Sequence, residues 1–161
     1  MTQTLDPTLF LPEPQPLRFE SGVSKLVRWQ IRNEQGGASL EQIKEPDGKV
    51  FLHIRATEST MASWRTRVLL EAGRYRFEGL ARANGIVGTK DEKKGEGAGL
   101  RISGSQQPRP NKLTGDAPLQ QLTYEFEAAA PSDEVELVCE LRATRGEVWF
   151  DLNSLQLVRI K

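Results

Sequence analysis

The sequence alternates between apolar and charged residues along residues 69–83 (LLEAGRYRFEGLARA), and no other feature constrains the fold as strongly. The apolar face of this segment carries Tyr75, Phe77, Gly79, Ala81 and Ala83. The opposite face carries Arg74, Arg76, Glu78 and Arg82. Successive side chains of a β-strand point to opposite faces of the sheet, so this two-residue period predicts a strand with one buried face and one face in solvent.

The same alternation recurs along the chain and predicts an all-β protein. We expect further strands at residues 17–20, 26–32, 38–44, 49–56, 63–70, 98–103, 119–128, 134–143 and 146–161. No segment keeps a helical period for three turns. Eight or more strands that are separated by turns, without helices, are typical of a two-sheet antiparallel sandwich.

The phase of the alternation predicts which side chains face the core. In residues 49–56 the inward side chains are predicted to be Val50, Leu52 and Ile54. The outward side chains are then Phe51, His53 and Arg55. In residues 26–32 one face carries Val27, Trp29 and Ile31. The phase breaks near Asn153 and Ser154, and a β-bulge is the simplest cause of such a slip.

The chain is predicted to consist of an N-terminal arm and one domain. Residues 1–16 contain four prolines, which oppose both helix and sheet. We therefore expect an arm or linker there, anchored on the surface by Leu9, Phe10 and Leu11. The β-sandwich domain covers residues 17–161. Within it, the polar, glycine-rich residues 84–97 and the proline-containing residues 104–118 are expected to be long loops.

Composition excludes several classes of protein. The 22 basic and 22 acidic residues cancel, which argues against general affinity for nucleic acid or anionic lipid. No apolar run approaches the ~18 residues of a transmembrane helix. The N-terminus shows no signal peptide, so we expect a cytoplasmic protein or an extracytoplasmic piece of a longer secreted chain. We expect a monomer that binds neither nucleic acid nor membrane.

No catalytic or cofactor motif is recognisable. The single cysteine, Cys139, is in phase with core positions and behaves as a small hydrophobe. His53 is the only histidine and has no second histidine or cysteine to complete a zinc site. Ser103 lacks the glycine pattern and the histidine partner of a nucleophile elbow. No helix follows the glycines of residues 95–99, as a dinucleotide fingerprint requires. We therefore expect no enzyme, no catalytic residue and no cofactor.

Four short passages, in order, resemble those of carbohydrate-binding-module-like, galactose-binding-like jelly rolls of bacterial glycan-active and surface proteins. The passages are Phe19-Glu20, Trp64 followed by AGRYRF at residues 72–77, residues 119–126, and VWFDLNSL at residues 148–155. In the third, Leu119 stands where a tryptophan is common. The resemblance implies jelly-roll topology and a non-catalytic module that binds an oligo- or polysaccharide as an appendage of a larger bacterial protein.

The resemblance also implies a structural calcium between the opening glutamate, Glu20, and the closing aspartate, Asp151. Calcium takes six to eight oxygen ligands, which carboxylates and backbone carbonyls at strand ends can supply. The sequence departs from the family here, since the usual Asn and Gly before Phe-Glu are missing and Asn153 follows Asp151 by two positions. The alternative is that Glu20 is an exposed charge at the rim and Asp151 caps or pairs locally.

A sugar site usually combines an aromatic platform with polar groups that bind hydroxyls. Phe51 and Trp149 are out of phase with the core and are the platform candidates, and Trp29 is ambiguous. Alternatively, Trp149 fills the edge of the core or is covered by the N-terminal arm. The other aromatic residues in phase with aliphatic ones are expected in the core.

The charged outward rows could form a polar groove on a concave sheet, lined by Arg76, Glu78, Arg101, Glu125, Glu140 and Arg142. The alternative is a solvated face on which arginine and glutamate pair across strands. In that case the chain would be a structural or protein–protein interaction sandwich without sugar binding.

Overall fold

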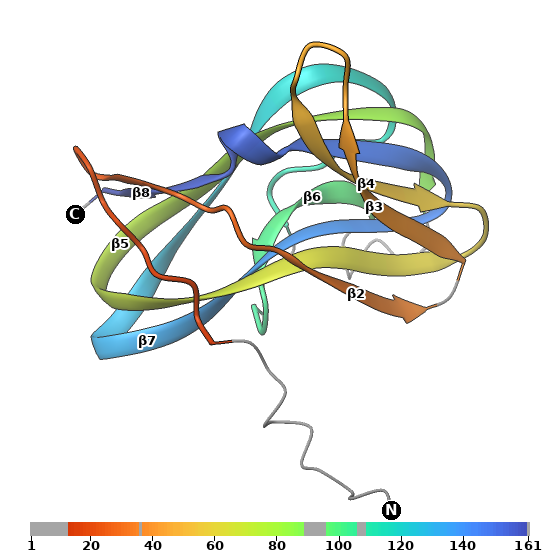
Figure 1. The fold of residues 1–161 in the computed structure, drawn as a ribbon. Helices are drawn as coiled ribbons and strands as arrows, with labels where there is room; N and C mark the ends of the chain where they lie inside the picture. Colours follow the sequence, from red (N-terminus) through yellow and green to blue (C-terminus); the bar gives the residue numbers. More distant parts are fainter. Residues whose placement is uncertain (1–12, 36, 89–95, 106–108, 161) are drawn as a thin grey trace, which may run out of the picture.

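The computed structural model describes residues 13–35, 37–88, 96–105 and 109–160, which form an all-β structure (Figure 1). Apart from the 3-10 turn η3 (Leu152–Ser154), these residues contain no helix, and so none that is long and apolar enough to cross a membrane. The strands are β1 (Val23–Lys25), β2 (Gln30–Gln35), β3 (Ala38–Lys44), β4 (Val50–Ala56), β5 (Thr60–Gly88), β6 (Gly97–Ile102), β7 (Gly115–Asp151) and β8 (Gln156–Arg159).

The strands are hydrogen-bonded in the order β1-β8-β5-β7-β4-β3, with β2 on β5 and β6 on β7. Two strands, β5 and β7, are long enough to bend and take part in two layers. Residues 60–71 of β5 pair with residues 132–143 of β7, and residues 73–86 pair with residues 115–128. In each ladder the partner number falls as the β5 number rises, which is the antiparallel register. The last part of β7 pairs with the opposite edge of β5, from Ala81 to Gly88.

These pairings define two sheets, which we call the first and the second sheet. The first sheet contains β1, β3, β4 and β8 with residues 73–88 of β5 and both ends of β7. The second contains β2, β6, residues 60–71 of β5 and residues 132–143 of β7. Figure 1 shows how β5 and β7 run side by side through the whole molecule and connect the two sheets.

The sheets enclose one apolar core. Trp29, just before β2, stacks on Phe77 of the first sheet with ring centroids 6.1 Å apart. The indole of Trp64 in the second sheet donates a hydrogen bond to the backbone oxygen of His53 in the first, at 3.2 Å. Tyr75 and Phe77, at 1% and 0% exposure, lie in the middle of this core. The predicted antiparallel sandwich and its buried aromatic residues are therefore confirmed.

The inward phase reverses wherever the chain passes between sheets. In β5 the inward residues are Trp64, Val68 and Leu70 before the bend at residues 71–73, and Tyr75 and Phe77 after it. Before that bend the even-numbered residues face the core, and after it the odd-numbered ones do. β7 does the same, with Leu122, Tyr124 and Phe126 inward, then Leu137, Cys139 and Leu141, then Val148 and Phe150.

Several local predictions are wrong. Of the predicted loop at residues 84–97, the first part continues β5 to Gly88, and β7 begins at Gly115 inside the predicted loop at residues 104–118. The slip at Asn153 and Ser154 is not a β-bulge but the turn η3, capped by the Asp151 carboxylate. Residues 17–20 form only the bridge of Glu20 with Val23. The proposed anchors Leu9, Phe10 and Leu11 lie outside the described residues.

Replacing Phe77 should test this core directly. The Phe77→Ala variant removes a fully buried ring that both sheets contact, so the free energy of unfolding should fall by about 3–5 kcal/mol. The measurement is urea denaturation at pH 7. Val27→Ala is the control, because Val27 is 64% exposed and its truncation should change stability by no more than about 0.5 kcal/mol. Equal effects of the two substitutions would contradict the core assignment.

Candidate functional site

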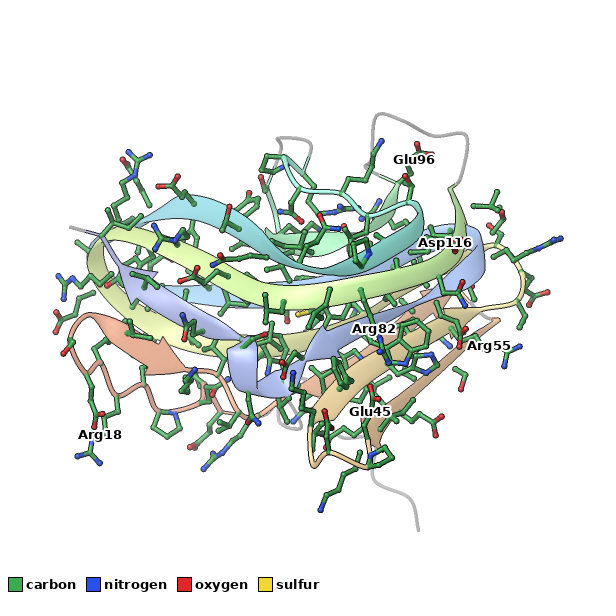
Figure 2. The ribbon with its side chains drawn as sticks, turned by 90° about the horizontal axis from the view of Figure 1, so that it is seen from above. Arg18, Glu45, Arg55, Arg82, Glu96 and Asp116 are labelled. Atoms are coloured by element: carbon green, nitrogen blue, oxygen red, sulfur yellow. The ribbon has the colours of Figure 1, made fainter. Side chains whose placement is uncertain are left out.

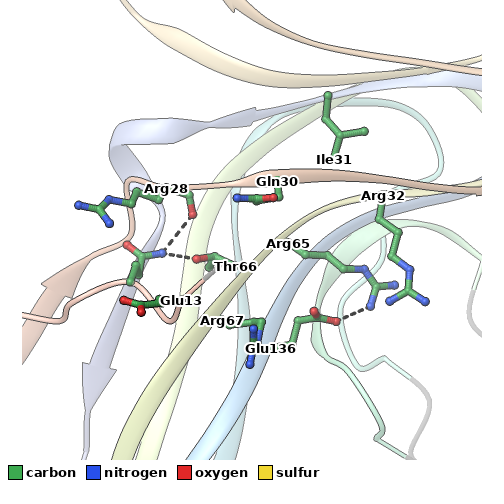
Figure 3. Close-up of a pocket in the computed structure, with 10 residues that line it drawn as sticks. Glu13, Arg28, Gln30, Ile31, Arg32, Arg65, Thr66, Arg67 and Glu136 are labelled. Atoms are coloured by element: carbon green, nitrogen blue, oxygen red, sulfur yellow. Dashed lines mark hydrogen bonds and ion pairs between the residues drawn. The ribbon is translucent and has the colours of Figure 1, made fainter. Parts of the chain in front are cut away.

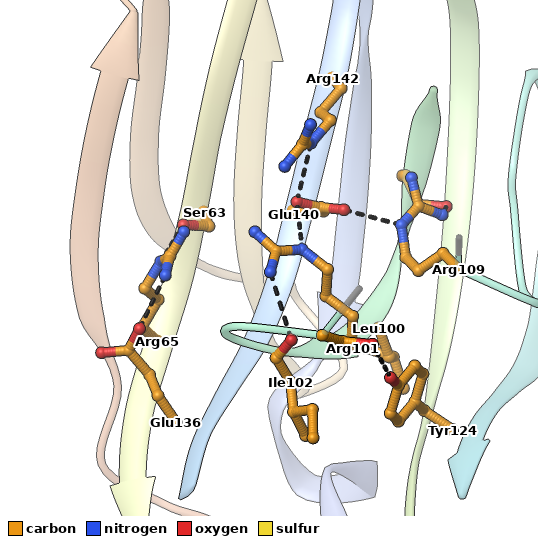
Figure 4. Close-up of polar contacts among 12 residues, drawn as sticks. Ser63, Arg65, Leu100, Arg101, Ile102, Arg109, Tyr124, Glu136, Glu140 and Arg142 are labelled. Carbon is orange, nitrogen blue, oxygen red and sulfur yellow. Dashed lines mark hydrogen bonds and ion pairs between the residues drawn. The ribbon is translucent and has the colours of Figure 1, made fainter. Parts of the chain in front are cut away.

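The outer face of the second sheet is a lattice of charged side chains whose positions follow from the strand register. Arg65 of β5 and Arg101 of β6 lie on either side of Val138 of β7. In the next row Ser63 lies opposite Glu140. Paired residues of adjacent strands point to the same face of a sheet, so these side chains form one continuous surface (Figure 4).

Three arginines converge on Glu140 in that surface (Figure 4). The Glu140 Oε1 atom accepts hydrogen bonds from Arg101 Nε at 2.8 Å and from Arg142 Nε at 3.1 Å. The Oε2 atom accepts one from Arg109 Nε at 2.7 Å. The side chains of Glu140 and Arg109 are each 2% exposed. Three guanidinium groups therefore share one buried carboxylate.

This arrangement keeps Glu140 ionised. Burial by itself raises the pKa of the carboxyl group, but the charges of Arg109, Arg101 and Arg142 outweigh it, and the pKa lies below its usual value of 4.5. Burial lowers the pKa of Arg109, and Glu140 opposes that change. On the inner side of the same strand, burial raises the pKa of the Cys139 thiol, as expected for a core cysteine.

Arg109 belongs to the segment before β7 and fixes that segment on the sheet. Its Nη1 atom donates to the backbone oxygens of Ala98 and Asn111, and its Nη2 atom donates to those of Glu96 and Gly97. Gly99 makes room for it, since a Cβ atom there would lie 2.3 Å from Arg109 Nη1. Arg109 could not be identified from the sequence, because a residue in an aperiodic segment has no pattern that predicts its contacts.

A groove of about 540 Å³ adjoins this cluster, between β2, β5 and the segment at residues 13–16 (Figure 3). Its lining includes Gln30 and Arg32 of β2, Arg65 and Arg67 of β5, and Glu136 of β7. Arg65 Nη1 donates to Glu136 Oε1 at 2.7 Å, and Arg67 pairs with Glu134. The groove therefore presents a row of guanidinium and amide groups, the donors that bind hydroxyl and anionic oxygens.

Gln15 lines one wall of the groove. Its backbone N–H donates to the Arg67 oxygen at 2.9 Å, and its side chain bonds to Thr66, to the Arg28 oxygen at 3.2 Å and to the Val27 N–H at 3.1 Å. The end of the predicted arm is thus hydrogen-bonded to the sandwich. The proline-rich sequence gave no signal of this contact, since one glutamine in such a segment is not distinctive.

The aromatic platform candidates do not lie in this groove. Phe51 and Trp29 are 3% and 9% exposed, so the expectation that Phe51 forms an accessible aromatic platform is wrong, although its side chain points outward as predicted. Phe51 lies on the outer side of the first sheet, outside the core, and the Arg82 guanidinium lies 5.0 Å from its ring centroid and 4.7 Å from that of Trp149. Arg82 also pairs with Glu45 at 2.7 Å (Figure 2). An arginine thus occupies the surface where a sugar ring would stack.

His53 completes this aromatic cluster. It was predicted to face outward and it does, but it is buried, with its ring 5.0 Å from that of Trp149 and its Nε2 atom 3.0 Å from Glu147 Oε1. The pairing of β4 with β7 places His53 directly opposite Trp149. Outward direction and burial coexist here because neighbouring side chains cover this part of the sheet.

The predicted polar groove divides between the two sheets. Arg101, Glu140 and Arg142 come together on the second sheet. The other three members lie on the outer side of the first sheet, where Arg76 pairs with Glu78 at 3.6 Å and lies opposite Glu125 in the register. The prediction that all six residues line one surface is therefore wrong, although all six point away from the core. Periodicity gives the direction of a side chain but not its sheet.

The two residues implied as calcium ligands, Glu20 and Asp151, lie toward opposite ends of the β1–β8 pair. Near Glu20, the Arg159 N–H donates to the Gly22 oxygen, and near Asp151 the Leu26 N–H donates to the Leu155 oxygen. Glu20 is exposed and pairs with Arg18 at 3.2 Å. The Asp151 carboxylate accepts the Asn153 N–H at 3.1 Å. No group of three metal-binding side chains occurs in the described ranges. This donor set does not fit the implied calcium site.

Comparisons with known proteins identify the fold. No protein-family model and no curated protein sequence matches this chain. Among solved structures, the carbohydrate-binding module TmCBM61, in complex with β-1,4-galactotriose, is similar at 14% identity and a TM-score of 0.50, over 86% of this chain and 92% of that one. A family 4 carbohydrate-binding module is similar at 14% identity and a TM-score of 0.50, over 81% and 86%.

A third similar structure is the enzymatically active domain of tailspike protein 4 from bacteriophage CBA120, at 6% identity and a TM-score of 0.53. The match covers 80% of this chain but only 19% of the tailspike chain. At these identities the similarity establishes the fold alone. The chain therefore has the jelly-roll fold of carbohydrate-binding modules, which confirms the topology that the four short passages implied.

Removal of the Glu140 carboxylate should be strongly destabilising. Glu140→Gln leaves three guanidinium groups near one another without their shared anion, and we expect the free energy of unfolding to fall by about 3–5 kcal/mol. Glu125→Gln is the control, because its side chain is 51% exposed and lies 3.8 Å from its arginine partner, so it should cost at most about 1 kcal/mol. Both variants are measured by urea denaturation at pH 7. If Glu140→Gln left the free energy of unfolding unchanged, Glu140 would not be the shared partner of the three arginines.

Acid should remove the contribution of Glu140 to stability. Its folded-state pKa lies below the usual 4.5, so the stabilisation is complete above the unfolded-state value and is lost as the pH falls through the folded-state value. We expect the stability of the wild-type protein to fall more steeply below about pH 4.5 than that of Glu140→Gln. Unfolding free energies between pH 7 and pH 2.5 measure this, and parallel curves would contradict it.

Calcium chelation should leave the protein unchanged. Because Glu20 and Asp151 are engaged separately, we expect the same Tm in calcium chloride and in EDTA, since only a ligand that binds the folded state raises stability. Differential scanning fluorimetry measures this with magnesium chloride as the control. A calcium-specific rise in Tm that Asp151→Asn abolishes would instead establish the calcium site.

Proposed function

We propose that this chain is a non-catalytic carbohydrate-binding module, an appendage of a larger protein, and that it binds an oligo- or polysaccharide in the groove on the outer face of the second sheet. The groove carries the proposal, because it lies on a fold that solved carbohydrate-binding modules share. It lies beside β2 and the segment at residues 13–16 (Figure 3).

The chemistry of the groove supports this proposal. Its volume of about 540 Å³ is within the ~300–1,000 Å³ of small-molecule sites. Guanidinium and amide groups present several donors in fixed geometry and can bind two neighbouring hydroxyl oxygens at once. Arg28 is exposed at its edge and makes no side-chain hydrogen bond or ion pair to the described part of the chain. Ile31, which is 52% exposed, adds an apolar surface beside these donors.

The carboxylates of this face support a non-catalytic role. Glycoside hydrolysis requires a carboxylic acid whose pKa is raised, so that it can donate a proton to the leaving group. The pKa of Glu140 is instead lowered by three arginines. Glu136 and Glu134 accept hydrogen bonds from Arg65 and Arg67. These contacts suit carboxylates that organise arginines rather than carboxyl groups that transfer protons.

The alternative function is a structural or protein–protein interaction sandwich without sugar binding. One observation favours it: the three tryptophans offer no open platform. Trp29 and Trp64 are buried in the core, and Arg82 and His53 lie against Trp149. Binding in the groove would then depend on hydrogen bonds and on Ile31 rather than on stacking.

Glycan screening followed by calorimetry tests the proposal. We expect at least one class of oligosaccharide to bind, and Arg28→Gln to weaken that binding several-fold without a change in Tm, because Arg28 is exposed and makes no side-chain hydrogen bond or ion pair to the described residues. The matched control is Arg74→Gln on the outer side of the first sheet, whose side chain is 51% exposed and which should bind normally. A blank screen would favour the interaction sandwich.

A further inference from the structure

We propose that the glycan bound by this module is anionic, and that its carboxylate or sulfate group is bound by Arg101 and Arg142 beside Glu140. This inference rests on the proposed function and names the class of sugar. It is carried by the number of charges, the remaining hydrogen-bond donors and the position of the cluster next to the groove.

The cluster has more cationic than anionic groups. Arg101, Arg109 and Arg142 all contact Glu140, so three positive charges meet one negative charge and leave a formal charge of +2. The nearby carboxylates with described contacts are already paired, Glu136 with Arg65 and Glu96 with Lys112 at 3.4 Å. No second carboxylate of the described residues contacts the three arginines.

The donors that remain belong to Arg101 and Arg142. All three nitrogens of Arg109 are used, by Glu140 and by four backbone oxygens. Arg101 Nε donates a hydrogen bond to Glu140, and Arg101 Nη1 donates one to the backbone oxygen of Ile102 at 3.3 Å. Arg142 uses only Nε. The Nη2 atom of Arg101 and both terminal nitrogens of Arg142 therefore have no hydrogen-bond partner within the described parts of the chain.

Partial burial makes these donors a suitable anion site. The side chains of Arg101 and Arg142 are 17% and 14% exposed, so water solvates their charges incompletely while a ligand can still reach them. A buried charge without a partner is unfavourable. A carboxylate or sulfate that accepts from both guanidinium groups would supply the missing anion and the missing acceptors, and such charge-assisted bonds are among the strongest in proteins.

The cluster and the groove form one surface. Arg65 lines the groove, and Val138 alone separates it from Arg101 in the strand register. Adjacent strands lie ~4.8 Å apart, so about 10 Å separates the backbones of β5 and β6. A short oligosaccharide that lies across the strands would contact the groove with one sugar and the Arg101–Arg142 pair with another. Figure 4 shows Arg65 and Glu136 beside the Glu140 cluster.

Titration calorimetry with four tetrasaccharides tests the inference. The probes are a galacturonate oligomer, its methyl ester, the neutral galactose oligomer and a heparin-derived sulfated oligomer. We expect an anionic probe to bind at least about tenfold more tightly than the neutral one at 50 mM NaCl. Preference between the galacturonate and sulfated probes identifies the anion, and loss of binding on methyl esterification assigns the effect to the carboxylate.

Variants separate this site from general charge attraction. Arg142→Gln should weaken anionic binding by about tenfold and reduce its salt dependence, whereas Arg142→Lys should restore only part of it, because lysine keeps the charge but not the planar fork. Arg101→Gln provides an independent second variant if Arg142→Gln unfolds, as judged by Tm. Arg74→Gln removes the same charge from the other sheet and should leave binding unchanged.

Three results would overturn the inference. Equal binding of the neutral and anionic probes would exclude an anionic ligand while leaving sugar binding established. Anionic binding that Arg142→Gln, Arg101→Gln and Arg74→Gln reduce equally would be non-specific attraction. No binding of any glycan, with Tm intact, would contradict the proposed function together with this inference.

Discussion

The pairing of β5 with β7 is the constraint on which the rest of the structure depends, because both strands belong to both sheets. Where these strands pass from one layer to the facing layer, the alternation of inward and outward residues shifts by one position. The apolar residues therefore face the core on both sides of each bend. Trp64 and Tyr75 therefore face the same core from opposite sheets, and Arg65 and Arg76 point away from that core on opposite sides of the molecule.

The Glu140 cluster is not an efficient way to stabilise the fold. A buried ion pair often stabilises a protein no more than apolar residues of similar volume, whereas a buried charge without its partner is strongly unfavourable. Arg109 has a clear structural role, since it joins the segment before β7 to β6. Arg101 and Arg142 have no comparable role, and they bring two further charges to a carboxylate that is already paired. Their placement is consistent with the anion site proposed above.

The sequence predicted most of the strands and the core, since the phase of alternation is a local property that survives the bends at residues 71–73 and near residue 130. It could not predict which outward side chains are buried beneath residues that are distant in sequence. Phe51 and His53 point outward as the pattern indicates, but Arg82 and Trp149, which are distant in sequence, cover them. It could not assign outward residues to a sheet either, so residues of both faces were combined into one groove. Arg109 and Gln15 lie in segments without alternating apolar and polar residues, so the sequence did not indicate their contacts.

The formal net charge of zero conceals a difference between the two outer faces. On the first sheet arginines have one or more glutamate partners, as in Arg76 with Glu78, Arg82 with Glu45 and Arg74 with Glu125 and Glu127. On the second sheet Arg65 and Arg67 pair in the same way, whereas Arg101 and Arg142 share the single carboxylate of Glu140 with Arg109. A local surplus beside a groove attracts anions over about a Debye length, ~8–10 Å in physiological salt. The charge would therefore attract an acidic chain toward the sheet before any direct contact forms.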